Sequence, residues 1–262
     1  MEKSKKNMRF NNLCKEALEI ENDRQKLASM NEFNLLARKY KPSLPEIKNL
    51  NTSNFWDQRI DEKIDYEPGD GMTMERVNIA YRFMPKDARK VFDIGAGYGY
   101  IERLLSKNSH IKIFGNDISG NAVKNLRKRF EGNFRLESIY SMKYPKHSFD
   151  AIFALEVFEH VPPSKIFKLM SDIKNLLRKN GYLILSVPTN EGLEKMRDNP
   201  NGHVRMYTEA LISAELKMAG FEVVSIKTLH AFKNLYRLKK IISMITKNRW
   251  KPNDIIVKAR FI

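Results

Sequence analysis

A glycine-rich turn between two apolar segments constrains the fold of this chain more than any other feature. Residues 91–99 are Val-Phe-Asp-Ile-Gly-Ala-Gly-Tyr-Gly, a predicted buried strand that runs into three glycines. After a short helical segment, a second apolar strand at 111–117 ends in Asp117, 22 residues after Gly95. Glycine lets the backbone approach a ligand closely, and an acid at this spacing accepts hydrogen bonds from both hydroxyls of a ribose. The pattern therefore predicts a nucleoside cofactor at the carboxyl ends of parallel strands.

The glycine spacing separates this turn from two other nucleotide-binding turns. A dinucleotide turn needs Gly-x-Gly-x-x-Gly, but its third glycine would fall at Tyr100, which disfavours a nicotinamide oxidoreductase. A phosphate-binding P-loop needs a Gly-Lys-Ser/Thr ending, and none follows. Residues 91–99 instead resemble motif I of the class I S-adenosylmethionine (SAM) methyltransferases, and Asp117 resembles their ribose-binding acid. The alternative is a doubly wound domain whose tight turn binds nothing.

The resemblance continues through residues 87–228 and implies an α/β fold. Its central element is a doubly wound, Rossmann-like sheet of seven mostly parallel strands, with the sixth and seventh strands antiparallel. The later strands are expected at 134–138, 151–155, 182–188, 221–228 and 255–261. Residues 87–262 form the predicted methyltransferase domain, and a helix at 209–218 is predicted to be capped by Thr208. In this family the residues before the first strand often form a lid over the substrate pocket.

The first 86 residues are predicted to form such a helical lid. Apolar residues recur at helical spacing through 13–40, and Phe55-Trp56 is a predicted anchor in the polar stretch that follows. A further helix is expected from Thr73 to Met84, stopped by Pro85.

The resemblance also assigns residues to the cofactor. SAM contacts are expected from residues of the turn and from the ends of the neighbouring strands: Asp93, Gly95, Gly97, Gly99, Asp117, Ile118, Ser138 and Leu155. The chain departs from the family at one of them. Many relatives carry an acid at position 138 that binds the adenine amino group, so here Glu137 or the hydroxyl of Ser138 must make that contact.

Polar side chains directly follow the predicted fourth strand. Glu156, Glu159 and His160 stand at i, i+3 and i+4, so a helix here would point all three to one side. His203 lies in the loop after the fifth strand, which should neighbour the fourth. We expect these four side chains to converge beside the methyl group of the cofactor.

Such a cluster supports two ways of activating a hydroxyl acceptor. Glu156, Glu159, His160 and His203 are suitable ligands for a divalent Mg²⁺, Mn²⁺ or Zn²⁺ ion, which would lower the pKa of a bound hydroxyl. Without a metal, His160 or His203 would act as the general base, with Glu156 as a further catalytic residue. The third alternative is structural, with Glu159 and His160 only holding the loop.

The motif Glu-x-x-Glu-His with a distant histidine resembles two branches of the superfamily. One is the quinone-biosynthesis O-methyltransferases, and the other is the small-RNA 3′-terminal 2′-O-methyltransferases, in which a similar motif holds a divalent ion. The RNA branch has further histidines that this chain lacks, because position 161 is Val161 and the later loop has His203 alone. Leu155-Glu-Val-Phe158 replaces the Asn/Asp-Pro-Pro-Tyr motif of many N-methyltransferases, which argues against methylation of a base nitrogen.

Charge distinguishes one C-terminal segment from the rest of the chain. The net charge is +16, and residues 230–251 hold seven basic residues and no acidic one. This segment is predicted to be a basic helical insertion, at 229–254, between the sixth and seventh strands. Its apolar stripe and cations fit an anionic membrane surface, a packed helix that presents cations to nucleic acid, or a plain surface helix with a solvated face.

Composition sets the compartment that we expect. A single cysteine, Cys14, excludes a disulfide framework, no apolar run approaches 18 residues, and the first residues lack a secretory signal pattern. These features predict a cytoplasmic protein, with peripheral membrane contact through 230–251 as a further possibility.

The function that these patterns favour is SAM-dependent O-methylation of a small-molecule or lipid-like acceptor. An RNA 2′-O-methyltransferase is the first alternative, supported by the basic charge. A non-catalytic scaffold with the SAM-binding fold, which recruits partners through 230–251, is the second.

Overall fold

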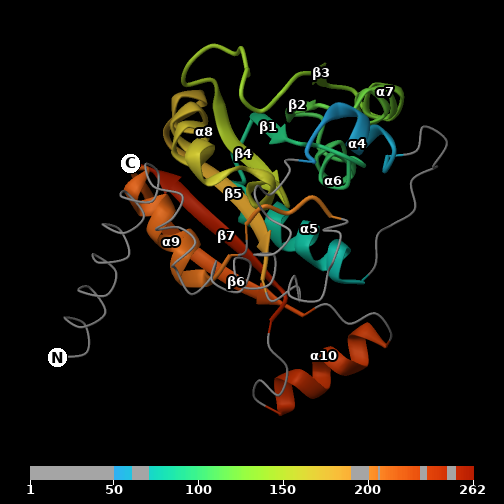
Figure 1. Cartoon of the computed structure of the whole chain (residues 1–262), viewed down its shortest axis with the longest axis vertical. Helices are drawn as coiled ribbons and strands as arrows, with labels where there is room; N and C mark the ends of the chain where they lie inside the picture. The colour runs from blue at the N-terminus through green and yellow to red at the C-terminus, as the bar shows by residue number, and fades with distance from the viewer. Residues whose placement is uncertain (1–49, 61–70, 190–200, 206, 231–234, 247–251) are drawn as a thin grey trace, which may run out of the picture.

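The computed structural model describes residues 50–60, 71–189, 201–205, 207–230, 235–246 and 252–262 (Figure 1). The helix expected at 13–40 lies outside the described residues. The boundary between a lid and a methyltransferase domain at 86/87 therefore stays a prediction.

A seven-stranded sheet forms the centre of the molecule, in the order β3-β2-β1-β4-β5-β7-β6. Each neighbouring pair from β3 to β5 is parallel, and β7 runs antiparallel to both β5 and β6. This confirms the predicted doubly wound, Rossmann-like fold with an antiparallel sixth and seventh strand. The strands are β1 (Lys90–Ile94), β2 (Lys112–Asp117), β3 (Asn133–Leu136), β4 (Phe149–Leu155), β5 (Leu177–Pro188), β6 (Phe221–Leu229) and β7 (Asp254–Phe261).

Helices cover both faces of the sheet (Figure 1). Along β4, Ile152 and Ala154 pack into one apolar cluster with α8 and α9, and Ala151 and Phe153 pack into another with α5, α6 and α7. Because successive side chains of a strand point to opposite faces, the unbroken apolar run at 151–155 of β4 packs on both sides of the sheet. The helical elements are α4 (Ser53–Asp57), α5 (Gly71–Phe83), α6 (Glu102–Leu105), α7 (Gly120–Arg129), the 3₁₀ turn η1 (Phe158–His160), α8 (Pro163–Leu176), α9 (Glu209–Met218) and α10 (Tyr236–Ile245).

Two helix predictions can be compared directly with the described residues. Helix α5 begins at Gly71, two residues before the expected Thr73, and ends at Phe83, before Pro85. Thr208 caps α9 as predicted, because its hydroxyl accepts a hydrogen bond from the backbone amide of Leu211 at 3.1 Å.

The strand order reverses between β1 and β4. Strand β1 pairs with β2 on one side and with β4 on the other, and the crevice at such a switch point is where α/β sheets bind ligands. The loops that follow β1 and β4 meet there. A Cβ on Gly95 would lie only 3.0 Å from Cγ2 of Val157, so the glycine turn and the β4 exit are in contact.

Candidate active site

The glycine turn and Asp117 form one half of the site. The carboxylate of Asp117, at the end of β2, accepts hydrogen bonds from the amides of Gly97 at 2.9 Å and Ser119 at 2.8 Å. A Cβ on Gly97 would meet nothing closer than the carbonyl of Gly95 at 3.9 Å, whereas one on Gly99 would lie within 2.8 Å of Leu126 and Phe130. The last glycine therefore permits packing against α7. The middle one leaves open space beside Asp117, where a ligand can approach the backbone.

The remaining predicted cofactor residues lie at the same edge of the sheet. Ile118, Ser138 and Leu155 are all half-buried at or just after the ends of β2, β3 and β4. The hydroxyl oxygen of Ser138 accepts from the amide of Tyr140 at 3.3 Å, and its own proton remains a donor. The carboxylate of Glu137 accepts from the amide of Lys143 at 3.3 Å. Contacts of these residues with SAM stay predictions.

Two buried carboxyl groups lie behind the turn. Asp93, at the end of β1, is 4% exposed, and Glu102, at the start of α6, is fully buried. Burial raises the pKa of Asp93 to about 7, although a hydrogen bond with Glu102 opposes the shift. Burial, followed by the nearby Asp93 charge, raises the pKa of Glu102 well above its ordinary value. Glu102 therefore keeps its proton and donates a hydrogen bond to the Asp93 carboxylate. Sequence analysis singled out Asp93 but missed Glu102.

The short segment at 50–60 joins the two halves of the site. On the cofactor side, the Asp57 carboxylate accepts hydrogen bonds from the Ser119 hydroxyl at 2.7 Å and the Asn121 amide at 3.2 Å. On the other side, the Trp56 ring meets the His160 ring edge-on, with centroids 4.9 Å apart. The predicted aromatic anchor is thus part of the site. Asn51 and Asp57, which no sequence motif marks, hold it there.

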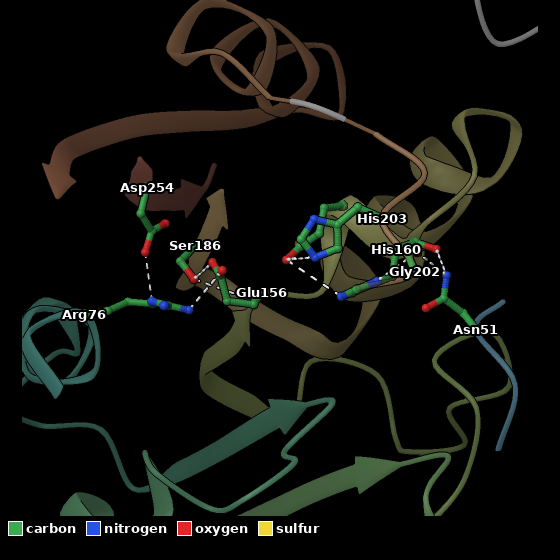
Figure 2. A network of polar contacts seen from close by, with 9 residues as sticks. Asn51, Arg76, Glu156, His160, Ser186, Gly202, His203 and Asp254 are labelled. Atoms are coloured by element: carbon green, nitrogen blue, oxygen red, sulfur yellow. Dashed lines mark hydrogen bonds and ion pairs between the residues drawn. The ribbon is translucent and has the colours of Figure 1, made fainter. Parts of the chain in front are cut away.

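Glu159, His160 and His203 converge at the β4 exit. Figure 2 shows His160 and His203 next to each other. Nε2 of His160 lies 3.8 Å, and Nε2 of His203 4.0 Å, from the same carboxylate oxygen of Glu159. The backbone fixes this arrangement, because the amides of Val204 and Arg205 both donate to the carbonyl of Glu159. Sequence analysis correctly placed these three side chains together.

The position of the proton on His160 follows from its contacts. Its Nδ1 lies 3.2 Å from the carbonyl oxygen of Gly202, which can only accept, so Nδ1 carries the proton. Burial, and then the neighbouring His203, lowers the pKa of His160 to about 3. The imidazole is therefore neutral at physiological pH, with a lone pair on Nε2 directed toward Glu159 and His203.

Glu156 does not join this cluster, contrary to the sequence expectation. It has a φ of +58° and is followed by a 3₁₀ turn, so residues 156–160 do not form the helix that would align it with Glu159. Its carboxylate instead accepts from the Ser186 hydroxyl at 2.8 Å and pairs with Arg76 at 3.0 Å. Arg76 also pairs with Asp254 at 2.8 Å (Figure 2).

The three remaining side chains fit a divalent ion in ligand type and approximately in distance. One ligand atom from each of Glu159, His160 and His203 lies within 4.8 Å of the others. Ligands of one ion stand roughly 3–3.5 Å apart, given metal–ligand distances near 2.1 Å, so a small inward movement would complete such a site. The neutral His160 and the buried carboxylate suit Zn²⁺ or Mn²⁺ better than Mg²⁺.

Comparison with known proteins agrees with this geometry. The sequence model of the methyltransferase-domain family matches residues 63–226. A sterol 24-C-methyltransferase from Gibberella zeae is 26% identical over 171 residues, 58% of this chain and 44% of that protein. A trans-aconitate 2-methyltransferase from Rhodopseudomonas palustris is 30% identical over 105 residues, 40% of each chain. A cyclopropane-fatty-acyl-phospholipid synthase from Escherichia coli is 25% identical over 107 residues, 41% of this chain and 28% of that protein. The match thus spans less than half the length of these curated relatives.

Solved structures share the fold at lower identity. The N-methyltransferase NodS from Bradyrhizobium japonicum, solved with S-adenosylhomocysteine, aligns with a TM-score of 0.61 and 14% identity. The alignment covers 80% of this chain and 98% of that one.

Proposed function

This chain belongs to the methyltransferase-domain family and is a SAM-dependent methyltransferase, and we propose that it methylates a hydroxyl of a lipid-like or small-molecule acceptor. The observation that carries the proposal is the convergence of Glu159, His160 and His203 beside the glycine turn. The proposal places these groups beside the methyl group of the cofactor, where the imidazole of His203 can take up a proton.

In this proposal the cofactor half of the site holds SAM. Asp117 accepts hydrogen bonds from the ribose, and the open space at Gly97 lets the cofactor approach the protein backbone. The sulfonium of SAM is already activated, so the protein mainly aligns acceptor oxygen, methyl carbon and sulfur. Residues 118, 138 and 155 complete the cofactor contacts.

The acceptor half removes the proton that makes a hydroxyl a poor nucleophile. His203 acts as the general base, and Glu159 orients it through the close approach to Nε2. The pKa of His160, lowered to about 3 by burial and by His203, makes it a weak base, so His160 positions its neighbours. Glu156, paired with Arg76, acts only through the shape of the loop.

A divalent ion is the alternative means of activation at the same place. Glu159, His160 and His203 would hold it, and it would lower the pKa of the acceptor hydroxyl. Chelation separates the two alternatives: EDTA leaves a histidine-based reaction unchanged and abolishes a metal-based one, with restoration by added Mn²⁺ or Zn²⁺.

The names of two relatives favour a lipid-like acceptor. They are the sterol methyltransferase and the fatty-acyl-phospholipid synthase. The trans-aconitate enzyme acts on a small water-soluble compound, which keeps that class open. None of these names refers to RNA, and the RNA alternative is supported by the basic charge and by the motif at 156–160, although this chain lacks the further histidines of the RNA branch.

The test is methyl transfer from SAM labelled with tritium in the methyl group. The enzyme is incubated with polar lipid extracts, with soluble hydroxylated compounds and with RNA, each followed by mass spectrometry of the labelled product. We expect an O-methyl product from one of the first two pools, and a decrease in kcat of about 100-fold or more in His203→Ala. Labelling of RNA, or of carbon or nitrogen, would refute the proposal. SAM binding without any product would favour the non-catalytic scaffold.

A further inference from the structure

Helix α10 carries its apolar face outward. Leu238, Ile241 and Ile245 lie at i, i+3 and i+7, on one face of the helix, and they are 51%, 54% and 74% exposed. Leu235, just before the helix, is 68% exposed. These four are more than half of the strongly exposed large apolar side chains in the described part of the chain, although α10 is only 10 residues long.

The opposite face of α10 is fixed to the domain. The hydroxyl of Tyr236 and the ammonium of Lys240 both donate to the carboxylate of Glu75 on α5. The ring of Tyr236 packs where Gly71 has no side chain, since a Cβ there would lie 2.7 Å from the ring. Ser243, on the same face, is buried. Polar contacts therefore orient the helix and leave its apolar stripe to the outside.

The charge that α10 itself contributes is entirely positive. Lys240 pairs with Glu75 on the packed face, Arg237 and Lys239 are further basic residues of the helix, and no residue of α10 is acidic. Over residues 230–251 the sequence has seven basic residues and no acidic one. A surface that combines exposed apolar side chains with cations alone is complementary to an anionic lipid bilayer, whose interface offers acyl chains next to phosphate groups.

The position of α10 relates this surface to the active site. The insertion leaves the sheet after Leu229 and returns at Asp254, and in the sheet Asp254 pairs with Pro188, the last residue of β5. The helix therefore projects from the carboxyl edge of the parallel strands, the edge that holds the cofactor turn and the β4 exit (Figure 1). Helix α5 contacts both regions, through Glu75 to α10 and through Arg76 to Glu156.

We propose that α10 binds to an anionic membrane surface, with its apolar stripe in the interfacial layer and its cations against lipid phosphates. A nucleic-acid surface would need the reverse arrangement, with the stripe buried on the domain and the cations outward. The proposal goes beyond the methyl-transfer reaction, because a membrane-bound enzyme can act on either a lipid or a soluble acceptor.

The experiment is vesicle flotation with the full chain, which needs no acceptor and no turnover. Vesicles of phosphatidylcholine alone are compared with vesicles that contain about one-third phosphatidylglycerol. We expect flotation with the anionic vesicles, weak binding to the neutral ones, and a loss of binding as salt is raised. The double variant Leu238→Glu/Ile241→Glu should bind about tenfold more weakly or worse.

The control variant is Leu136→Glu on β3, whose parent side chain is 60% exposed and distant from α10 in the sheet order. It should float as the wild type does, and circular dichroism and SAM titration verify that all variants are folded. Equal flotation of the double variant, or no flotation of the wild type, would overturn the proposal. A dimer that the double variant converts to monomer, without vesicle binding, would assign the stripe to a second copy. Retention by RNA alone would assign it to nucleic acid.

Discussion

The two halves of the candidate site are assembled in different ways. In the cofactor half, the turn and the acid meet within one βαβ unit, and the hydrogen bond from Gly97 to Asp117 spans 20 residues. In the acceptor half, the Asn51 side chain donates to the Gly202 carbonyl, 151 residues away in sequence. Arg76 pairs with Glu156, directly after β4, and with Asp254, the first residue of β7. A contiguous unit can be recognised from its spacing, whereas the second half exists only in the folded sheet. The acceptor half can therefore change from one relative to another without altering the cofactor half.

The two halves also differ in their electrostatics. In the cofactor half, the backbone amides of Gly97 and Ser119 donate hydrogen bonds to the Asp117 carboxylate. The acceptor half contains a buried guanidinium, Arg76, between the carboxylates of Glu156 and Asp254. Burial, followed by the Glu156 charge, raises the pKa of Asp254 well above its ordinary value, and the Arg76 guanidinium opposes that rise. Substitutions should therefore affect ligand binding in one half and stability in the other.

Replacement of Asp117 should give the largest effect on binding. Asp117→Ala removes the acceptor of both ribose hydrogen bonds, and charge-assisted bonds are worth about 1.5–3 kcal/mol each, so SAM affinity should fall by about 100-fold or more. Isothermal titration with SAM and S-adenosylhomocysteine measures the change. Asp87→Ala, at an exposed acid before β1, is the control and should bind normally. SAM binding of Asp117→Ala within about threefold of wild type would refute the ribose assignment.

Replacement of Arg76 should instead affect folding. Arg76→Met leaves the buried Asp254 and the half-buried Glu156 without their shared cation, and loss of one partner of a buried ion pair costs about 3–5 kcal/mol. Urea denaturation measures the free energy of unfolding. Arg82→Met, at an exposed arginine on the same helix, should change it by less than about 0.5 kcal/mol.

A second substitution separates charge from packing at this site. Asp254→Asn, combined with Arg76→Met, removes one of the two stranded charges and should recover part of the lost stability. If Arg76→Met unfolds no more easily than Arg82→Met, the buried network does not have the stabilising role that we assign to it.

Features that depend on local sequence could be predicted, and features that depend on contacts between distant residues could not, as in the two halves of the site. The strands and the turn at 95–99 could be predicted because each depends on local patterns of apolar residues and glycine, and the doubly wound arrangement followed from the resemblance to the methyltransferase family. The cluster of Glu159, His160 and His203 could be predicted because both segments lie in the loops that follow neighbouring parallel strands, β4 and β5. The charge and apolar stripe of α10 were visible, but not its orientation, because Glu75 and Gly71 on a distant helix determine which face packs inward.

Glu156 illustrates why the rest could not be predicted. Its spacing from Glu159 and His160 fits a helix, and nothing local indicates its left-handed backbone or the 3₁₀ turn that follows. The side chain is directed to Ser186 and Arg76, and those partners are 30 and 80 residues away in sequence. Glu102 was missed for a related reason, since only the folded turn shows that its carboxyl group is buried against Asp93.

The last contrast concerns that buried pair and appears as a dependence of stability on pH. Folding raises the pKa of Asp93 to about 7 and that of Glu102 well above normal, chiefly through burial, so the folded state holds protons that the unfolded state has lost. The protein without cofactor should therefore lose stability as pH rises from about 4 toward 7, by up to about 1.4 kcal/mol per pH unit for each proton retained.

The variant Glu102→Gln tests this dependence, because its side-chain amide still donates to Asp93 but does not titrate. We expect a shallower slope between pH 5 and 8, equal stability near pH 5 within about 1 kcal/mol, and higher stability than wild type at pH 8. Urea denaturation across this range tests it, with Glu131→Gln, an exposed acid, as the control. Parallel slopes for all three proteins would mean that Glu102 is ionised in the folded state and that the cofactor half, unlike the acceptor half with Arg76, contains a buried charge without a paired cation.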